Sequence, residues 1–185
     1  TQQEQGLLAK VEMGVGAWQW GDRLFWGYKQ GYDDQDILNA FEIAISSGIS
    51  LFDTAEVYAQ GKSELMLGKL KKGISQPLIV ATKFMPFPWR LTHNSLHRAL
   101  QGSLKRLGIE CVDLYQIHQP LPPIKVESWM EAMVEVMQLG MVKAVGVSNY
   151  DLGLTRRSQD ALAKEGINYY RDLCRKYIAT MRAAS

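Results

Sequence analysis

The chain repeats one structural unit, in which a short apolar, strand-like run is followed by an amphipathic, helix-like stretch. Strand-like runs begin near residues 50, 78, 112 and 142, and a further run lies near residues 11–17. This spacing of about 30 residues is the length of a strand plus its crossover helix. Such alternation predicts an α/β fold with parallel strands and right-handed crossovers.

Cap residues and glycines mark the ends of the predicted helices. Asp33 or Asp34 can cap a first helix that ends at Gly48, and Thr92 can cap a later helix that ends at Gly108. Short polar side chains at a helix start accept hydrogen bonds from free backbone N–H groups, and glycine adopts the left-handed conformation that ends a helix. These positions therefore separate the strands from the helices.

Three ionisable residues stand where predicted strands end: Asp53, Lys83 and His118. The carboxyl ends of parallel strands are where α/β folds place their chemistry. Tyr58 follows closely after Asp53. The order of these four residues therefore indicates a proton-transfer site.

The residue types suit proton transfer to a carbonyl oxygen. A tyrosine hydroxyl has a pKa of about 10, so it needs a cation such as Lys83 to stabilise its phenolate. Asp53 can keep that lysine charged. His118 can donate a hydrogen bond to the substrate oxygen while hydride arrives from a cofactor. Taken singly, each residue also fits a structural role, such as a buried ion pair or a half-buried ring.

The segments around these residues resemble the aldo-keto reductase family. The resemblance rests on FDTAEVY at residues 52–58, ATK at 81–83 and VDLYQIH at 112–118, with GVGAW at 14–18 and VGVSN at 145–149 in support. The family fold is a parallel (β/α) barrel of the TIM type. The resemblance therefore implies that fold for the matching part of the chain.

The resemblance also implies roles for individual residues. The family's catalytic tetrad, with the tyrosine as general acid, corresponds to Asp53, Tyr58, Lys83 and His118. The residues that hold the nicotinamide carboxamide of NADP(H) correspond to Ser148 and Asn149. The implied activity is the reduction of small aldehydes or ketones to alcohols.

Aromatic residues in two loops are predicted to line an apolar substrate pocket. They are Trp18 and Trp20, together with Phe25, Trp26 and Trp89, which are placed by loop position alone. The loops themselves, residues 18–22 and 84–90, are most similar to those of cyanobacterial and plant plastid aldo-keto reductases.

The resemblance covers about five of the eight strand–helix units of a complete barrel. Such a barrel typically has more than about 250 residues, whereas this chain has 185. Residues 1–166 are therefore predicted to form a partial barrel. In the family, the absent part supplies much of the cofactor site, including the residues that favour NADP. An open sheet leaves strand edges unpaired, so a homo-oligomer or a larger complex is expected if the chain is truncated.

Residues 167–185 are predicted to form a separate C-terminal helix of uncertain register. Apolar residues recur at helical spacing, and Arg171, Arg175 and Lys176 lie on the opposite face. A basic amphipathic helix can dock on an acidic partner or a membrane surface. The preferred interpretation is a helix packed on the open sheet, because that sheet has apolar surface to cover.

Two functional hypotheses follow. The first is an NADPH-dependent aldo-keto reductase with Tyr58 as general acid. The alternative is a catalytically silent reductase-like fragment that serves as a scaffold or assembly subunit, which the missing cofactor half suggests. Helix–strand alternation by itself also fits other α/β classes.

The composition bears on the class of protein and on its location in the cell. The chain is 46% hydrophobic and 22% charged, which is ordinary for a globular protein. No apolar run approaches the roughly 20 residues of a membrane span, and no secretory signal is evident, so the cytoplasm is predicted, with the plastid stroma as alternative. Cys111 and Cys174 are too few for a disulfide framework.

Neither a nucleic-acid partner nor a metal is predicted. The basic run at residues 69–72 is short and suits a helix C-terminus. His93 and His97 lie four apart on a predicted helix and share a face, but no third ligand is evident nearby, so a solvated helix face is the preferred interpretation.

Overall fold

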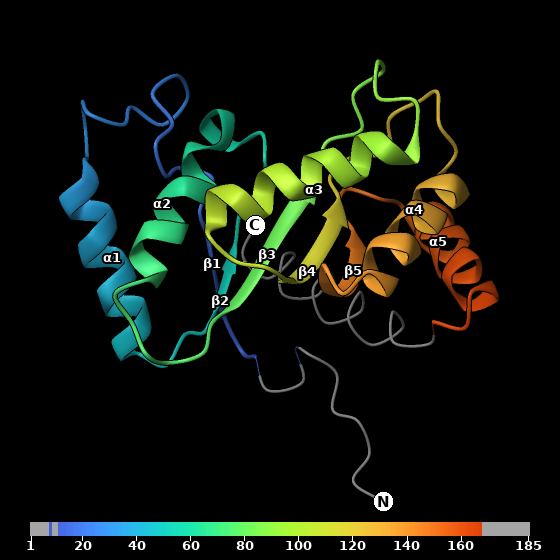
Figure 1. Ribbon diagram of the computed structural model, residues 1–185. Coiled ribbons are helices and arrows are strands. Elements are labelled where there is room, and N and C mark those ends of the chain that lie inside the picture. The colour runs from blue at the N-terminus through green and yellow to red at the C-terminus, as the bar shows by residue number, and fades with distance from the viewer. Residues whose placement is uncertain (1–7, 9–10, 168–185) are drawn as a thin grey trace, which may run out of the picture.

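The computed structural model describes residue 8 and residues 11–167. Five parallel strands form one sheet in the order in which they follow one another along the chain (Figure 1). They are β1 (Gly14–Gly16), β2 (Leu51–Asp53), β3 (Ile79–Phe84), β4 (Val112–Ile117) and β5 (Val142–Val147). The predicted α/β fold with parallel strands is confirmed. The helix predicted over residues 167–185 lies, apart from Ile167, outside the described residues.

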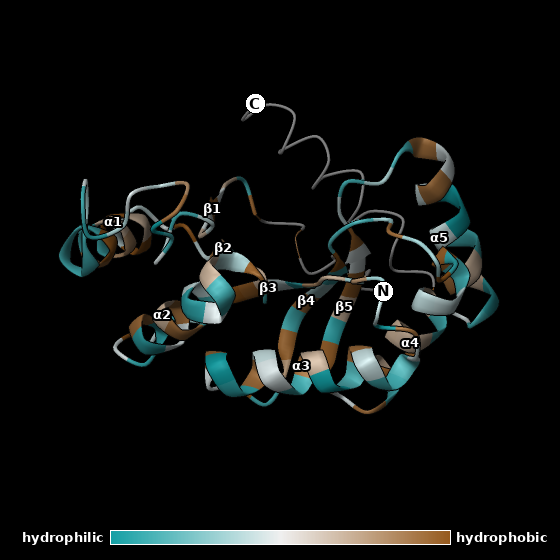
Figure 2. Cartoon of the chain, turned by 90° about the horizontal axis from the view of Figure 1, so that it is seen from above, coloured by the Kyte–Doolittle hydropathy of each residue, from teal (hydrophilic) through white to brown (hydrophobic). Residues whose placement is uncertain are grey.

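Helices alternate with the strands. They are α1 (Asp34–Ser46), α2 (Lys62–Lys71), α3 (His93–Leu107), α4 (Val126–Gln138) and α5 (Leu152–Lys164), with a short turn, η1 (Tyr58–Gly61), before α2. Seen from above, the five helices follow one another in an arc along one side of the sheet (Figure 2). None of the helices in the described ranges is long and apolar enough to cross a membrane.

The helix ends follow the sequence signals closely. Asp33 caps α1, because its carboxylate accepts from the backbone N–H groups of Gln35 and Asp36 while the Asp36 carboxylate accepts from the N–H of Asp33. Thr92 occupies the N-cap position of α3, but its hydroxyl makes no cap hydrogen bond to the helix backbone. Gly108 ends α3 with a φ of 66°, which glycine adopts without steric cost.

The main core lies between the sheet and the helices. Along the strands, the side chains of this core alternate with those of the other face. The largest fully buried side chains in the core include Phe52, Phe84 and Tyr115 from the strands and Phe41 and Trp129 from the helices. Burial of large apolar side chains of this kind is the dominant favourable term in folding. This core fixes the relative positions of β2, β3 and β4, whose ends carry the candidate site.

The opposite face of the sheet changes character along the strands. Towards the amino ends it is an apolar cluster in which Leu8 meets one residue from each of β2 to β5, namely Leu51, Ala81, Leu114 and Ala144. Side chains two positions further along a strand lie on the same face. Asp53 therefore follows Leu51 on this face, and Lys83 follows Ala81. This face thus becomes polar at the carboxyl ends of the strands.

Candidate active site

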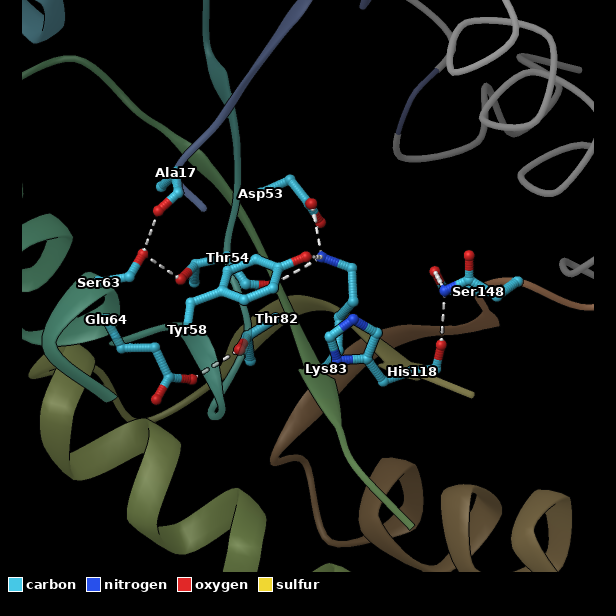
Figure 3. A network of polar contacts seen from close by, with 11 residues as sticks. Ala17, Asp53, Thr54, Tyr58, Ser63, Glu64, Thr82, Lys83, His118 and Ser148 are labelled. Carbon is cyan, nitrogen blue, oxygen red and sulfur yellow. Dashed lines mark hydrogen bonds and ion pairs between the residues drawn. The ribbon is translucent and has the colours of Figure 1, made fainter. Parts of the chain in front are cut away.

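The structure brings the four predicted tetrad residues together at the carboxyl end of the sheet (Figure 3). Asp53 is the last residue of β2, Lys83 lies near the end of β3, and His118 directly follows β4. Tyr58 is the first residue of η1. Its ring lies edge to face with the His118 ring, with 5.5 Å between the ring centroids.

Lys83 lies at the centre of the site. Its side chain is 2% exposed, and its Nζ donates to Oδ2 of Asp53 at 2.5 Å and to the carbonyl oxygen of Thr54 at 2.8 Å. The third contact is with the Tyr58 hydroxyl, at 3.4 Å. A buried ammonium is costly unless it is paired and hydrogen-bonded, and these contacts satisfy that need.

Tyr58 holds its proton at neutral pH. Burial raises the pKa of its hydroxyl above the usual value because it disfavours the charged phenolate, while the nearby Lys83 ammonium acts in the opposite direction. The phenol is therefore a proton donor next to a cation that stabilises its conjugate base. This arrangement suits a general acid that works on an oxygen anion as it forms.

His118 is neutral at pH 7. Burial, with a smaller contribution from the Lys83 charge, lowers the pKa of its imidazole to about 4. Its Nδ1 atom is buried and has no hydrogen-bond partner among the described residues. A neutral imidazole carries one N–H donor and one acceptor, so it can donate to a substrate oxygen without adding charge.

A left-handed turn follows Tyr58. Ala59 and Gln60 have φ values of 47° and 57°, and Gly61 has a φ of 87°. Non-glycine residues in this region are strained, and such strain is typical of functional sites whose surroundings hold it in place. The turn brings the chain from Tyr58 directly into α2. This turn was not predicted from the sequence, because neither Ala59 nor Gln60 signals a left-handed conformation.

A buried carboxylate fixes the loop after β3. Glu56 accepts from the backbone N–H of Met85 at 2.7 Å, and the Arg90 guanidinium pairs with both of its oxygens. The guanidinium also lies over the rings of Phe84 and Phe87. Glu56 was not predicted from the sequence as a site residue, although it lies inside the segment FDTAEVY, where Asp53 is the other acidic residue.

The predicted pocket tryptophans occupy different positions. Trp18 stacks on the Tyr58 ring with 6.1 Å between centroids and forms a T-shaped pair with Trp26. Trp89 stacks on Phe87 and is 73% exposed. Trp20 is buried against core phenylalanines instead. Trp18 therefore lies beside the tetrad, Trp89 lies exposed on the loop after β3, and Trp20 belongs to the core rather than to a pocket.

Ser148 and Asn149 follow β5, next to the His118 end of β4. The Asn149 amide nitrogen donates to the carbonyl oxygen of His118 at 2.9 Å and to Oγ of Ser148 at 3.1 Å. Asn149 adopts a φ of 60°, a conformation that asparagine tolerates better than most residues. The Ser148 hydroxyl can donate and the Asn149 amide oxygen can accept. These two groups match the acceptor and the donors of a carboxamide, so this pair fits the nicotinamide end of NADP(H).

His93 and His97 share one carboxylate partner. Nδ1 of His93 and Nε2 of His97 lie 2.7 and 3.0 Å from the two oxygens of Glu135 on α4. Across the residues that the structure describes, no group of three or more His, Cys, Asp and Glu side chains could hold a metal ion. The pair links two helices, which differs from the solvated face expected from sequence.

Comparison with known proteins identifies relatives of this sequence and fold. The sequence model of the Aldo/keto reductase family matches residues 12–169. The chain is 38% identical over 177 residues to the chloroplastic pyridoxal reductase of Arabidopsis thaliana, covering 89% of this chain and 48% of that protein. It is 35% identical over 151 residues to the aldo-keto reductase YhdN of Bacillus subtilis, covering 76% of this chain and 44% of that one.

Solved structures show the same architecture. The thermostable aldo-keto reductase Tm1743, solved with the inhibitor epalrestat, aligns with a TM-score of 0.72 at 31% identity, over 86% of this chain and 57% of that one. An aldo/keto reductase from Klebsiella pneumoniae, solved with NADP and acetate, aligns with a TM-score of 0.65 at 28% identity, over 78% and 47%. The chain thus spans about half the length of the curated relatives it matches. On its sequence and its architecture, the chain belongs to the Aldo/keto reductase family.

Proposed function

We propose that the chain provides the proton-transfer site of an NADPH-dependent reductase that converts aldehydes or ketones to alcohols. The observation that carries this proposal is the contact of the Lys83 ammonium with both the Asp53 carboxylate and the Tyr58 hydroxyl in a buried site. Structures of relatives that hold NADP or NADPH support the choice of cofactor.

Each tetrad residue has one task in this proposal. Tyr58 donates its hydroxyl proton to the substrate oxygen as negative charge develops there. Lys83 stabilises the phenolate that Tyr58 leaves behind, and Asp53 holds that ammonium in place. His118, neutral at pH 7, donates a hydrogen bond that orients the substrate oxygen.

Ser148 and Asn149 are the residues proposed to hold the carboxamide of the cofactor, which supplies the hydride when it is bound. Both lie at the end of β5, beside the backbone of His118. The same hydrogen bond that fixes Asn149 therefore also fixes the strand end that carries His118. This link supports a common site for the cofactor carboxamide and the substrate oxygen.

The aromatic side chains beside Tyr58 favour flat, aromatic carbonyl compounds. Trp18, which is 48% exposed, stacks on the Tyr58 ring and packs edge to face with Trp26. Aromatic aldehydes are therefore the first substrates to test, and pyridoxal is one of them because the Arabidopsis relative is a pyridoxal reductase. We propose a cytoplasmic location, with the plastid stroma as the alternative that this chloroplastic relative favours.

The deciding experiment compares two tyrosine variants in an assay of NADPH consumption. Tyr58→Phe removes the proposed acid, so turnover should fall at least about 100-fold, the usual contribution of general acid catalysis. Tyr115→Phe is the matched control, since Tyr115 is fully buried and its hydroxyl has no partner within the described ranges. Unchanged turnover in Tyr58→Phe would refute the assignment.

A catalytically silent scaffold or assembly subunit is the second candidate, because among the described residues only Ser148 and Asn149 are proposed to hold the cofactor. Under this proposal residues 1–166 form a partial barrel and residues 167–185 a helix that packs on it or on another subunit. Titration with NADPH, followed by tryptophan fluorescence, separates the candidates. Saturation at micromolar NADPH favours the reductase, and no binding at millimolar NADPH favours the scaffold.

A further inference from the structure

Behind the tetrad lies a second set of buried polar side chains, carried by the first turn of α2. Ser63 and Glu64 are both fully buried there. α2 begins directly after the left-handed turn that follows Tyr58. The polar side chains of this helix end are therefore attached by a few residues of backbone to the proposed general acid (Figure 3).

Glu64 links three elements of the fold. Its Oε1 accepts from the Thr82 hydroxyl on β3 at 2.6 Å, and its Oε2 accepts from Nε of Arg106 on α3 at 2.6 Å. Gly61 makes room for the arginine, because a Cβ there would lie 2.7 Å from the Arg106 Cδ. Hydrogen bonds to a charged carboxylate are short and directional, so Glu64 sets the position of α2 against β3.

Ser63 links the same helix turn to β1 and β2. Its hydroxyl donates to the carbonyl oxygen of Ala17 at 2.7 Å and lies 2.7 Å from Oγ1 of Thr54. Because the single Ser63 proton goes to Ala17, the Thr54 hydroxyl must donate to Ser63. The helix turn is thus tied to the ends of three neighbouring strands.

Two of these contacts, those with Thr82 and Thr54, end directly beside a residue of the tetrad. Thr82 directly precedes Lys83 on β3. Thr54 directly follows Asp53, and its carbonyl oxygen accepts from the Lys83 ammonium. The Glu64 contact therefore fixes β3 next to Lys83, while the backbone of η1 and α2 fixes Tyr58 to Glu64.

We propose that Glu64 is a positioning residue that sets the distance between the Tyr58 hydroxyl and the Lys83 ammonium. This inference rests on the proposed reductase function, since it names a residue that acts through Tyr58 and Lys83. The long 3.4 Å contact between those two groups is the part of the site that depends most on the relative placement of η1 and β3. A misplacement of about 1 Å can cost about 100-fold in rate.

Two variants weaken the contacts that Glu64 makes with Thr82 and Arg106, each at a different atom. Glu64→Gln removes the charge that holds Arg106 and keeps an acceptor for Thr82. Thr82→Val removes only the hydroxyl and keeps the shape of the side chain. Asp113→Asn is the matched control, because Asp113 is a buried carboxylate that accepts from the Val80 backbone N–H at 2.8 Å and from Lys143 at 2.7 Å, near the amino end of β4.

The first readout does not require turnover. The ammonium of Lys83 is followed by ¹⁵N-lysine NMR in the 185-residue chain, and its signal is assigned by its loss in Lys83→Arg. In the wild-type protein its protons should exchange slowly with water at pH 7. Glu64→Gln and Thr82→Val should each accelerate that exchange at least about tenfold, and Asp113→Asn should leave it unchanged.

The second readout separates positioning from general stability. Both variants should lower kcat about tenfold while KM for the aldehyde stays within about twofold, because they misplace the acid without touching the substrate. The double variant should be no worse than Glu64→Gln, since the two residues act as one unit. Thr82→Val alone carries the test if Glu64→Gln does not fold.

The outcomes are distinguishable. An unchanged Lys83 exchange rate in Glu64→Gln and Thr82→Val, or an equal acceleration in Asp113→Asn, overturns the positioning role. A wild-type chain without NADPH-dependent turnover counts against the proposed function instead. In that case the Lys83 exchange rates still decide whether Glu64 holds the Tyr58–Lys83 geometry.

Discussion

The Nζ atom of Lys83 lies 2.5 Å from the Oδ2 atom of Asp53, and the two side chains are 2% and 16% exposed. The pair stands at the ends of adjacent parallel strands, β2 and β3. Removing one member of a buried ion pair leaves the other charge without compensation, which costs more than the loss of a surface pair. The stability of the fold is therefore tied to the geometry of the proposed site.

Asp53→Asn should lower the free energy of unfolding by about 3 kcal/mol, because the amide cannot compensate the buried Lys83 charge. Urea titration followed by circular dichroism measures the change. Glu127→Gln is the control, since the Glu127–Arg157 pair on α4 and α5 is exposed and should contribute little. Equal midpoints for the two variants would contradict the prediction.

Acid should weaken the fold through His118. The pKa of this imidazole falls from 6.5 to about 4 on folding, so between these values the unfolded chain binds a proton that the folded protein does not. The stabilisation is therefore complete above pH 6.5 and is lost as the pH falls towards 4. Its size is up to about 3 kcal/mol.

Urea midpoints measured at pH 7.5 and pH 4.5 check this prediction. The wild-type protein should lose more stability over this interval than His118→Gln, because the glutamine cannot titrate. The comparison between the two proteins removes the contribution of other titrating groups, such as Glu135, whose pKa the neighbouring His93 lowers. Parallel pH profiles for the two proteins would rule out the proposed role of His118 in the acid response.

The strands, and the grouping of the four candidate residues at their carboxyl ends, could be predicted because the sequence signals for them are local. Period-two alternation places Asp53 and Lys83 on one face, and parallel strands bring their ends together. The Glu64–Arg106 pair had no such signal, since its two residues lie 42 positions apart and meet only through the packing of α2 on α3. The link between His93 and Glu135 was missed for the same reason.

The aromatic residues in the loops show a second limit of prediction from the sequence. Trp18 and Trp20 are two positions apart, which would place them on one side of an extended strand, yet only Trp18 lies beside Tyr58. The chain turns after β1, where the N–H of Trp20 donates to the carbonyl oxygen of Ala17. That turn directs Trp20 into the core against Phe41. Residue type alone does not distinguish a pocket tryptophan from a core tryptophan.

Ala59→Gly should stabilise the protein. Ala59 has a φ of 47°, and the left-handed conformation costs a non-glycine residue about 1–2 kcal/mol. Glycine removes that strain but loses more chain entropy on folding, so the net gain should be about 0.5–1 kcal/mol. Ala161→Gly in α5 should have the opposite sign, because glycine weakens a helix interior. Chemical denaturation of both variants decides the matter, and a destabilised Ala59→Gly would contradict the assigned strain.

Arg90→Lys should loosen the loop that carries Trp89. The guanidinium donates to both oxygens of Glu56 and to the carbonyl oxygen of Met85, and lysine cannot reproduce that fork. Without this fork, the Glu56 carboxylate is held less firmly. The hydrogen bond that the Met85 N–H donates to Glu56 then opens to water more often. Hydrogen exchange in a peptide covering residues 84–92 should therefore accelerate, while exchange in α4 stays unchanged. Unchanged exchange in residues 84–92 would show that the Met85 hydrogen bond and the packing of Phe84 suffice to hold the loop.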